Sequence, residues 1–240
     1  RLITIILDVS LSMNFSGRFA VAKRAAIELL SVLNPNDMVM VISFSGGVKE
    51  LLPPTRLTNT SVIINKINQA EAENGTNISS AFKHAYDLMP KNFHEKQVIL
   101  ISDGMNPADD YGESVSLADQ MSRDGILIST LGIFATADGR KLLTDIYGTN
   151  TLPGAFNKNI EHEQDIDFTI KDISGEKQQV RIEGDRYSVD FDRTDDVAEG
   201  IENIGEISGF WYNAAKSTAT TAVTAKYFRD KTTSFDVPVY

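Results

Sequence analysis

The stretch that decides the fold runs from Leu2 to Ser12 and reads LITIILDVSLS. Its first part, Leu2 to Leu7, is a continuous apolar run rich in β-branched residues. This is typical of a central strand in a parallel sheet, where both faces are buried. Its second part places Asp8, Ser10 and Ser12 directly after that strand. Because open α/β sheets bind ligands at the carboxyl ends of their strands, these three side chains are the first candidates for a functional site.

The same alternation continues to about residue 147. Buried-strand runs recur at 38–44 (MVMVISF), 98–101 (VILI) and 126–131 (ILISTL). Between and beside them, apolar residues recur at helical spacing within 19–33, 62–67, 78–89 and 115–121. Strands that alternate with helices in this way predict an α/β fold with a doubly wound, mostly parallel sheet flanked by helices, as in Rossmann-like proteins.

The pattern changes near Gly148. Residues 149–158 resemble a loop with a short strand at Ala155-Phe156, and 161–173 suit a helix with isoleucines on one side. Beyond Gly175 we expect short alternating strands, at 180–182, 187–191 and 222–227, before an apolar run at 235–240. These changes predict two domains, residues 1–173 and a β-rich extension at 174–240 that forms part of an incomplete second domain.

Composition excludes several classes of function. The chain has no cysteine, which excludes disulfides, thiolate zinc sites and cysteine nucleophiles. Its net charge is −10 and no basic cluster is visible, so we expect no nucleic-acid partner. No run approaches the roughly 20 apolar residues that a membrane helix needs, so we expect these 240 residues not to span a membrane. The start at Arg1, without Met or a signal-like segment, suggests a piece of a longer protein.

Five side chains form a candidate metal site. Asp8, Ser10 and Ser12 follow the first strand, Thr76 lies in an Asn-Gly-Thr-Asn loop that opens a helix, and Asp103 follows the third apolar strand. Hard oxygen donors, two of them anionic, match Mg²⁺ or Mn²⁺, with Ca²⁺ also compatible. Singly, each has an ordinary alternative: Asp8 and Thr76 as helix N-caps, the serines as loop hydroxyls, and Asp103 as part of a turn. Their common position at the ligand-binding edge favours the metal site.

Together these residues resemble the complete metal-ion-dependent adhesion site of von Willebrand factor type A (VWA) domains, and the resemblance covers about residues 2–173. It implies that Ser10, Ser12 and Thr76 contact the metal directly. Asp8 and Asp103 would bind it directly or through water, depending on conformational state. An Asp or Glu carboxylate of a protein partner would fill the remaining position. Leu11 departs from the family, in which many members have Gly there.

The second part of the chain has a weaker resemblance, carried by 195–200 (DDVAEG), 207–210 (ISGF), 219–224 and 236–239. These runs are similar to a stretch of bacterial membrane proteins that pair a VWA domain with a class I glutamine amidotransferase-like module. The resemblance implies an extracytoplasmic location and a membrane anchor in the full-length parent. The amidotransferase cysteine has no counterpart here. The alternative is a generic β-rich extension with Trp211 in its core.

The motifs argue against an enzyme. No G-x-S-x-G elbow, Walker loop or G-x-G-x-x-G follows the first strand, and His84, His94 and His162 belong to no visible motif. We therefore expect a metal-dependent, adhesion-type protein-binding domain. The alternative is the substrate-recruiting VWA subunit of an intracellular chaperone or chelatase complex, which would share the metal motif. In the family, affinity switching is coupled to the last helix, here 140–147 or 161–173.

Overall fold

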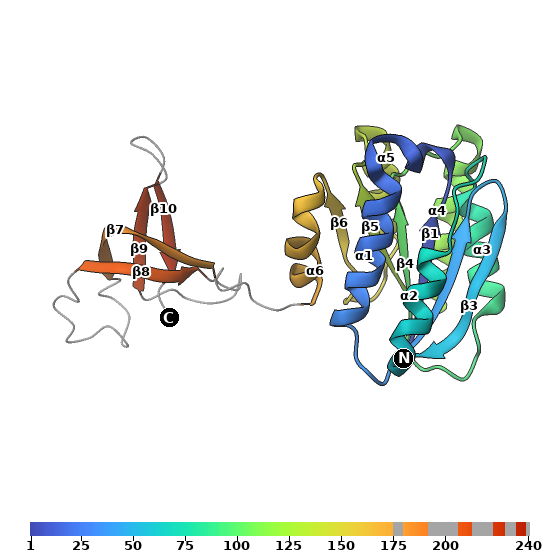
Figure 1. Ribbon diagram of the computed structural model, residues 1–240, viewed down its shortest axis with the longest axis horizontal. Coiled ribbons are helices and arrows are strands. Elements are labelled where there is room, and N and C mark those ends of the chain that lie inside the picture. Colours follow the sequence, from blue (N-terminus) through green and yellow to red (C-terminus); the bar gives the residue numbers. More distant parts are fainter. Residues whose placement is uncertain (175–179, 192–205, 213–222, 229–233, 239–240) are drawn as a thin grey trace. The chain divides into compact units, whose positions relative to one another are not determined.

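The computed structural model describes residues 1–174, 180–191, 206–212, 223–228 and 234–238, with side chains described up to residue 173. The chain divides into two compact units, Arg1–Ser174 and Gly175–Tyr240, which Figure 1 shows in the colours of the sequence.

The first unit is built on a six-stranded sheet with the order β3-β2-β1-β4-β5-β6. All neighbouring strands are parallel except β2 and β3. The strands are β1 (Leu2–Asp8), β2 (Met38–Phe44), β3 (Val48–Arg56), β4 (Lys96–Ser102), β5 (Ile126–Ile133) and β6 (Asn157–Ile160). This arrangement confirms the predicted doubly wound, mostly parallel sheet.

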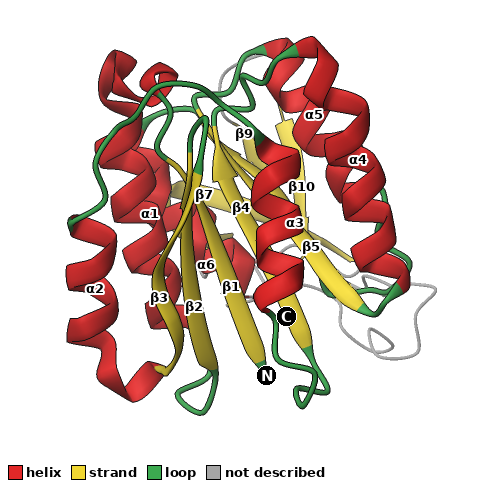
Figure 2. Ribbon diagram, turned by 90° about the vertical axis from the view of Figure 1, so that its right-hand side faces the viewer, coloured by secondary structure: helices red, strands yellow, loops and turns green. Residues whose placement is uncertain are grey.

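Helices cover both faces of this sheet (Figure 2). One face carries α1 (Arg18–Val32), α2 (Thr60–Asn68) and α6 (Ile166–Ser174), and the other carries α3 (Ile78–Leu88), α4 (Ala108–Arg123) and α5 (Ala137–Tyr147). Short 3₁₀ turns lie at η1 (Leu11–Gly17), η2 (Leu57–Asn59) and η3 (Glu163–Asp165). Burial of both faces of β1 explains why its sequence is mainly apolar. Ile3 and Ile5 pack in the core on one face, while Leu2 and Ile6 pack in the core on the other.

Strand β3 was not expected from the sequence, because Pro53 and Pro54 interrupt it. Proline cannot donate a backbone hydrogen bond, so it is normally restricted to edge strands and bulges. Both conditions hold here. Strand β3 lies at the edge of the sheet, and the prolines fall where the register with β2 shifts between Val39 and Val41.

Two further elements differ from the prediction. The short strand expected at Ala155-Phe156 lies instead at β6, where three of the four residues are polar and pairing with β5 supplies the hydrogen bonds. The helix expected from residue 161 begins as α6 at Ile166, because η3 precedes it. The hydrophobic pattern therefore predicted a strand and a helix in this region but not the residues at which β6 and α6 begin and end.

The second unit contains an antiparallel four-stranded sheet with the order β10-β9-β7-β8. Its strands are β7 (Val180–Phe191), β8 (Glu206–Tyr212), β9 (Val223–Phe228) and β10 (Ser234–Pro238). The strands expected at 180–182 and 187–191 are one strand with a register shift between Glu183 and Tyr187. The expected core position of the Trp211 side chain, the run at 195–200 and residues 219–222 lie outside what is described. In the described part of the chain, no helix has the length and apolar character needed to cross a bilayer.

Candidate metal centre

The candidate centre lies where the strand order of the first sheet reverses. From β1 the chain passes through α1 to β2 on one side, whereas β4, on the other side of β1, leads through α4 to β5. Connections that leave in opposite directions open a crevice at the carboxyl ends of the central strands. Asp8 is the last residue of β1, and Asp103 directly follows β4.

Asp8 is fully buried and its two oxygens have different partners. Its Oδ1 accepts a hydrogen bond from the backbone N–H of Ser10 at 2.8 Å, and its Oδ2 accepts one from the Ser102 hydroxyl at 2.5 Å. Burial raises the pKa of Asp8 to about 6. The hydrogen bonds from Ser10 and Ser102 lower it, and the charge of Asp103 raises it further. The carboxylate is thus oriented but incompletely compensated for its loss of water.

The two serines that follow Asp8 place their hydroxyls together. Ser10 Oγ and Ser12 Oγ are 2.9 Å apart, and Ser10 is almost fully buried. Ser10 also forms an isolated parallel bridge with Glu73, whose N–H donates to the carbonyl of Val9 at 2.7 Å. These contacts tie the segment that leads to Thr76 to the end of β1.

The loop that carries Thr76 is held against the turn after β2. The N–H of Gly46 donates to the carbonyl of Asn74 at 2.9 Å, and Gly75 has φ +87°. A Cβ on Gly75 would lie 2.7 Å from the Cα of Gly46, so the close approach requires glycine. The cap of the following helix is Asn77, whose Oδ1 accepts from the N–H of Ser80 at 2.7 Å.

Thr76 is therefore not the N-cap of α3. Its hydroxyl takes part in none of the hydrogen bonds found within residues 1–173, and no such bond joins it to the other four candidates. Thr76 and Ser12 do line the same pocket, together with Gly104, which follows Asp103. The pocket has a volume of about 620 Å³. The structure thus places all five candidates at one edge of the sheet, and Ser12 and Thr76 are the two that line the pocket.

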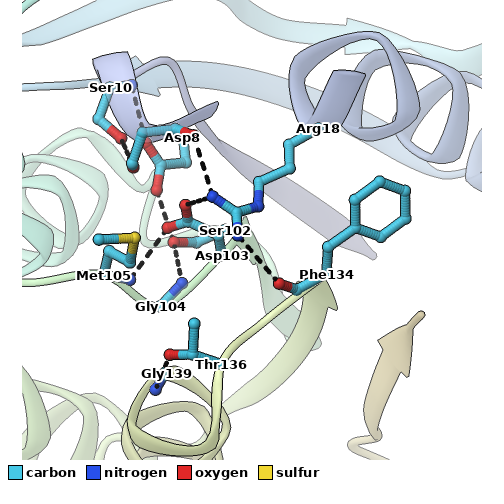
Figure 3. Close-up of polar contacts among 11 residues, drawn as sticks. Asp8, Ser10, Arg18, Ser102, Asp103, Gly104, Met105, Phe134, Thr136 and Gly139 are labelled. Carbon is cyan, nitrogen blue, oxygen red and sulfur yellow. Dashed lines mark hydrogen bonds and ion pairs between the residues drawn. The ribbon is translucent and has the colours of Figure 1, made fainter. Parts of the chain in front are cut away.

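Asp103 is buried beside a positively charged side chain (Figure 3). Its Oδ1 accepts from the N–H of Met105 at 3.0 Å, and its Oδ2 lies 3.3 Å from Nη1 of Arg18. Arg18 and Ser102 are the contacts that sequence reasoning missed. Ser102 is adjacent to a candidate, which was the only signal for it. Arg18 is separated from Asp103 by 85 positions, and no sequence pattern links the two.

A contact between two glycines fixes the backbone around Asp103. Gly104 has φ +73°, and a Cβ there would lie 2.5 Å from the carbonyl oxygen of Gly139. Conversely, a Cβ on Gly139 would lie 2.3 Å from the carbonyl oxygen of Asp103. Gly139 is in the first turn of α5, whose N-cap is Thr136. The backbone that carries Asp103 is therefore packed directly on the start of α5.

The donor set fits a hard divalent cation. Two carboxylates are buried together, and Arg18 is the one cation that pairs with either of them within residues 1–173. The hydroxyls of Ser10 and Ser12 lie 2.9 Å apart, and the Thr76 hydroxyl, which lines the same pocket as Ser12, has no hydrogen-bond partner among these residues. In the described chain no three His, Cys, Asp or Glu side chains cluster as a metal site would require. Any ion here would therefore depend on hydroxyl ligands as well as on Asp8 and Asp103.

Comparison with known proteins supports the fold of the first unit. Residues 3–106 match the family model described as von Willebrand factor type A domain. The first unit has the VWA fold. Comparison with curated protein sequences gave no significant match.

Several solved structures share this VWA fold. The conserved hypothetical protein BatB from Bacteroides thetaiotaomicron is 20% identical, with a TM-score of 0.58 over 72% of this chain and 97% of that one. An aerotolerance-related membrane protein from Bacteroides fragilis is 18% identical, with a TM-score of 0.58 over 72% and 98%. Proximal thread matrix protein 1 from the mussel byssus, solved with a zinc-occupied MIDAS motif, is 16% identical, with a TM-score of 0.61 over 72% and 44%. At these identities the likeness establishes the fold alone.

Proposed function

We propose that the first unit is a divalent-metal-dependent protein-binding domain and not an enzyme. Asp8, Ser10, Ser12, Thr76 and Asp103 would hold one Mg²⁺, or Mn²⁺ or Ca²⁺ in its place. The ion would accept an Asp or Glu side chain of a protein partner. The observation that carries the proposal is that two buried carboxylates and the paired hydroxyls of Ser10 and Ser12 lie at one edge of the sheet, where Ser12 and Thr76 line a pocket.

The surroundings of the centre favour binding over catalysis. Lys141 lines the pocket, but hydrogen bonds to Asp145 and Tyr111 raise the pKa of its amine, so it stays protonated at neutral pH. It therefore cannot act as a general base. Tyr111 and Asp145 are in turn engaged by Lys141 and by each other. Two of the ionisable groups that line the pocket, Tyr111 and Lys141, are therefore already paired, which favours a role in binding.

Exposed apolar side chains surround the same edge. Leu11 and Phe15, on η1, are 44% and 67% exposed, and Met105, two residues after Asp103, is 47% exposed. Apolar groups next to a charged centre are a common feature of protein interfaces, which combine an apolar core with a few strong polar contacts. The partner is therefore expected to present its carboxylate between apolar side chains.

The setting of the parent protein is also a proposal. The likeness to BatB and to an aerotolerance-related membrane protein, together with the resemblance of 195–200 and 236–239 noted above, supports an extracytoplasmic domain of a membrane-anchored bacterial protein. The alternative, a recruiting subunit of an intracellular complex, would use the same metal centre. Isolation of the partner from the envelope or from the cytoplasm distinguishes the two settings.

Titration calorimetry tests the metal site. Wild type should bind one Mg²⁺ or Mn²⁺, and Asp8→Ala and Asp103→Ala should each lose most of that affinity. Asp109→Ala removes an exposed carboxylate from the first turn of α4 and should bind like wild type. Equal affinity in all four proteins would refute the assignment.

Affinity capture tests the use of the ion. A partner that depends on the centre should be retained with Mg²⁺ and released by EDTA. Replacement of one partner Asp or Glu by its amide should have the same effect as EDTA. A partner retained equally in EDTA would show that binding uses another surface.

A further inference from the structure

Arg18, the first residue of α1, links the three loops that form the candidate centre (Figure 3). Its Nη1 lies 3.2 Å from the carbonyl oxygen of Ser12 and 3.3 Å from Asp103 Oδ2. Its Nη2 lies 3.4 Å from the carbonyl oxygen of Phe134, in the loop between β5 and α5. The side chain is 15% exposed, so the guanidinium is partly withdrawn from water.

Hydrogen bonding alone does not account for this position. All three contacts are long, and the buried Nε has no partner within the described residues. A partly buried guanidinium with an unpaired N–H loses solvation energy that these bonds restore only in part. The remaining favourable term is the attraction between Arg18 and Asp103, whose side chain is only 1% exposed.

The net formal charge of the centre follows from its three ionised side chains and the metal ion. Asp8 and Asp103 bring two negative charges and Arg18 brings one positive charge, which leaves one net negative charge without an ion. A divalent cation would convert this to one net positive charge. Without Arg18 the same cation would leave the centre neutral. Arg18 therefore opposes the arriving metal ion and favours an arriving carboxylate.

We propose that Arg18 sets this balance: it lowers the affinity of the centre for divalent metal and keeps the loaded centre positive enough to attract a carboxylate. The proposal rests on the proposed function, since it names how that site discriminates in favour of an acidic partner. In the absence of metal, Arg18 compensates the buried charge of Asp103. With metal bound, that carboxylate is shared between two cations.

The first test measures metal binding to the whole chain. Arg18→Gln removes the charge but keeps an amide that can donate to the carbonyl of Ser12. It should bind Mn²⁺ tighter by on the order of tenfold, because two like charges no longer face each other in a partly buried site. Arg18→Lys keeps the charge and should bind like wild type. Arg24→Gln is the matched control, since Arg24 lies on the same helix and pairs with exposed Glu163 and Asp167.

The second test measures the attraction for a carboxylate, with acetate as the probe. Acetate that enters the coordination shell of bound Mn²⁺ displaces water and reduces the relaxation of bulk water protons. The acetate concentration needed for half of this effect should rise severalfold in Arg18→Gln and should not change in Arg24→Gln. Tighter Mn²⁺ binding combined with unchanged acetate binding would overturn the second half of the proposal.

A third measurement separates this proposal from the proposed function. Unfolding in EDTA is compared for wild type, Arg18→Gln, Asp103→Asn and the double variant. If Arg18 compensates Asp103, the loss of stability from Arg18→Gln should be smaller in the Asp103→Asn background. Wild type that binds no Mn²⁺ would refute the proposed function and the metal-affinity role with it, even if this coupling is found. Wild type that binds Mn²⁺ while Arg18→Gln binds it equally or more weakly would refute the role of Arg18 alone.

Discussion

Replacement of Gly104 by alanine should destabilise the protein far more than the same change at another glycine of similar conformation. Gly104 and Gly125 have φ of +73° and +78°, values that an alanine adopts at a loss of about 1 kcal/mol or slightly more. A Cβ at Gly125 would meet nothing within 4 Å. A Cβ at Gly104 would lie 2.5, 2.6 and 2.7 Å from backbone atoms of Gly139, which cannot rotate away as a side chain can.

The backbone of the loop or of α5 must therefore move in Gly104→Ala. Overpacking of this kind typically costs roughly 1–3 kcal/mol, and we take about 2 kcal/mol as the further loss. We expect Gly125→Ala to lose about 1 kcal/mol and Gly104→Ala about 3 kcal/mol. Urea unfolding in EDTA measures both without any contribution from metal, and similar m-values would show that the unfolded states are comparable. If the two variants lost equal stability, the argument that the Gly104–Gly139 contact fixes the Asp103 backbone would be wrong.

Three further predictions follow from other features. Gly112→Ala, in the middle of α4 with nothing within 4 Å of the added Cβ, should stabilise by about 0.5–1 kcal/mol, visible as a higher Tm. Burial raises the pKa of Asp8 from 3.8 to about 6, so its contribution to stability in EDTA should be fully present below pH 3.8 and be lost as the pH rises through about 6. Mg²⁺ affinity should rise over the same window, and Asp8→Asn should abolish the fall in stability; a fall that persists in this variant would assign it to other groups. Limited proteolysis should cut between residues 148 and 184 and leave an N-terminal fragment that still binds metal, whereas a single protected, cooperatively melting chain would contradict two independent domains.

The sequence was most informative where one property determined the local structure. The central strands were recognisable because burial on both faces makes them mainly apolar, as in β1. Strand β6 was misplaced because three of its four residues are polar, and pairing with β5 holds it instead. Strand β3 was missed because Pro53 and Pro54 contradict strand propensity, which only the edge position allows.

The same division applies to the candidate centre. The five candidate ligands could be named because each follows a strand or opens a helix at the expected edge. The role of Arg18 could not be found in this way. Its contacts with Asp103 and Phe134 span 85 and 116 positions, and depend on how three loops pack together. Asn77 also replaces Thr76 as the cap of α3, a choice between neighbouring residues that depends on backbone angles.

The prolines of β3 also determine how copies of this domain behave when crowded. An exposed edge strand with regularly spaced N–H groups is a template on which a second chain can add a strand. Pro53 and Pro54 have no N–H groups, so this part of the edge strand offers fewer donors, and the register shift beside them interrupts the regular pairing. Lateral polymerisation through this edge is thereby discouraged. Many copies on one surface could then stand close together without fusing into fibrils, and each would keep its loop edge available for recognition.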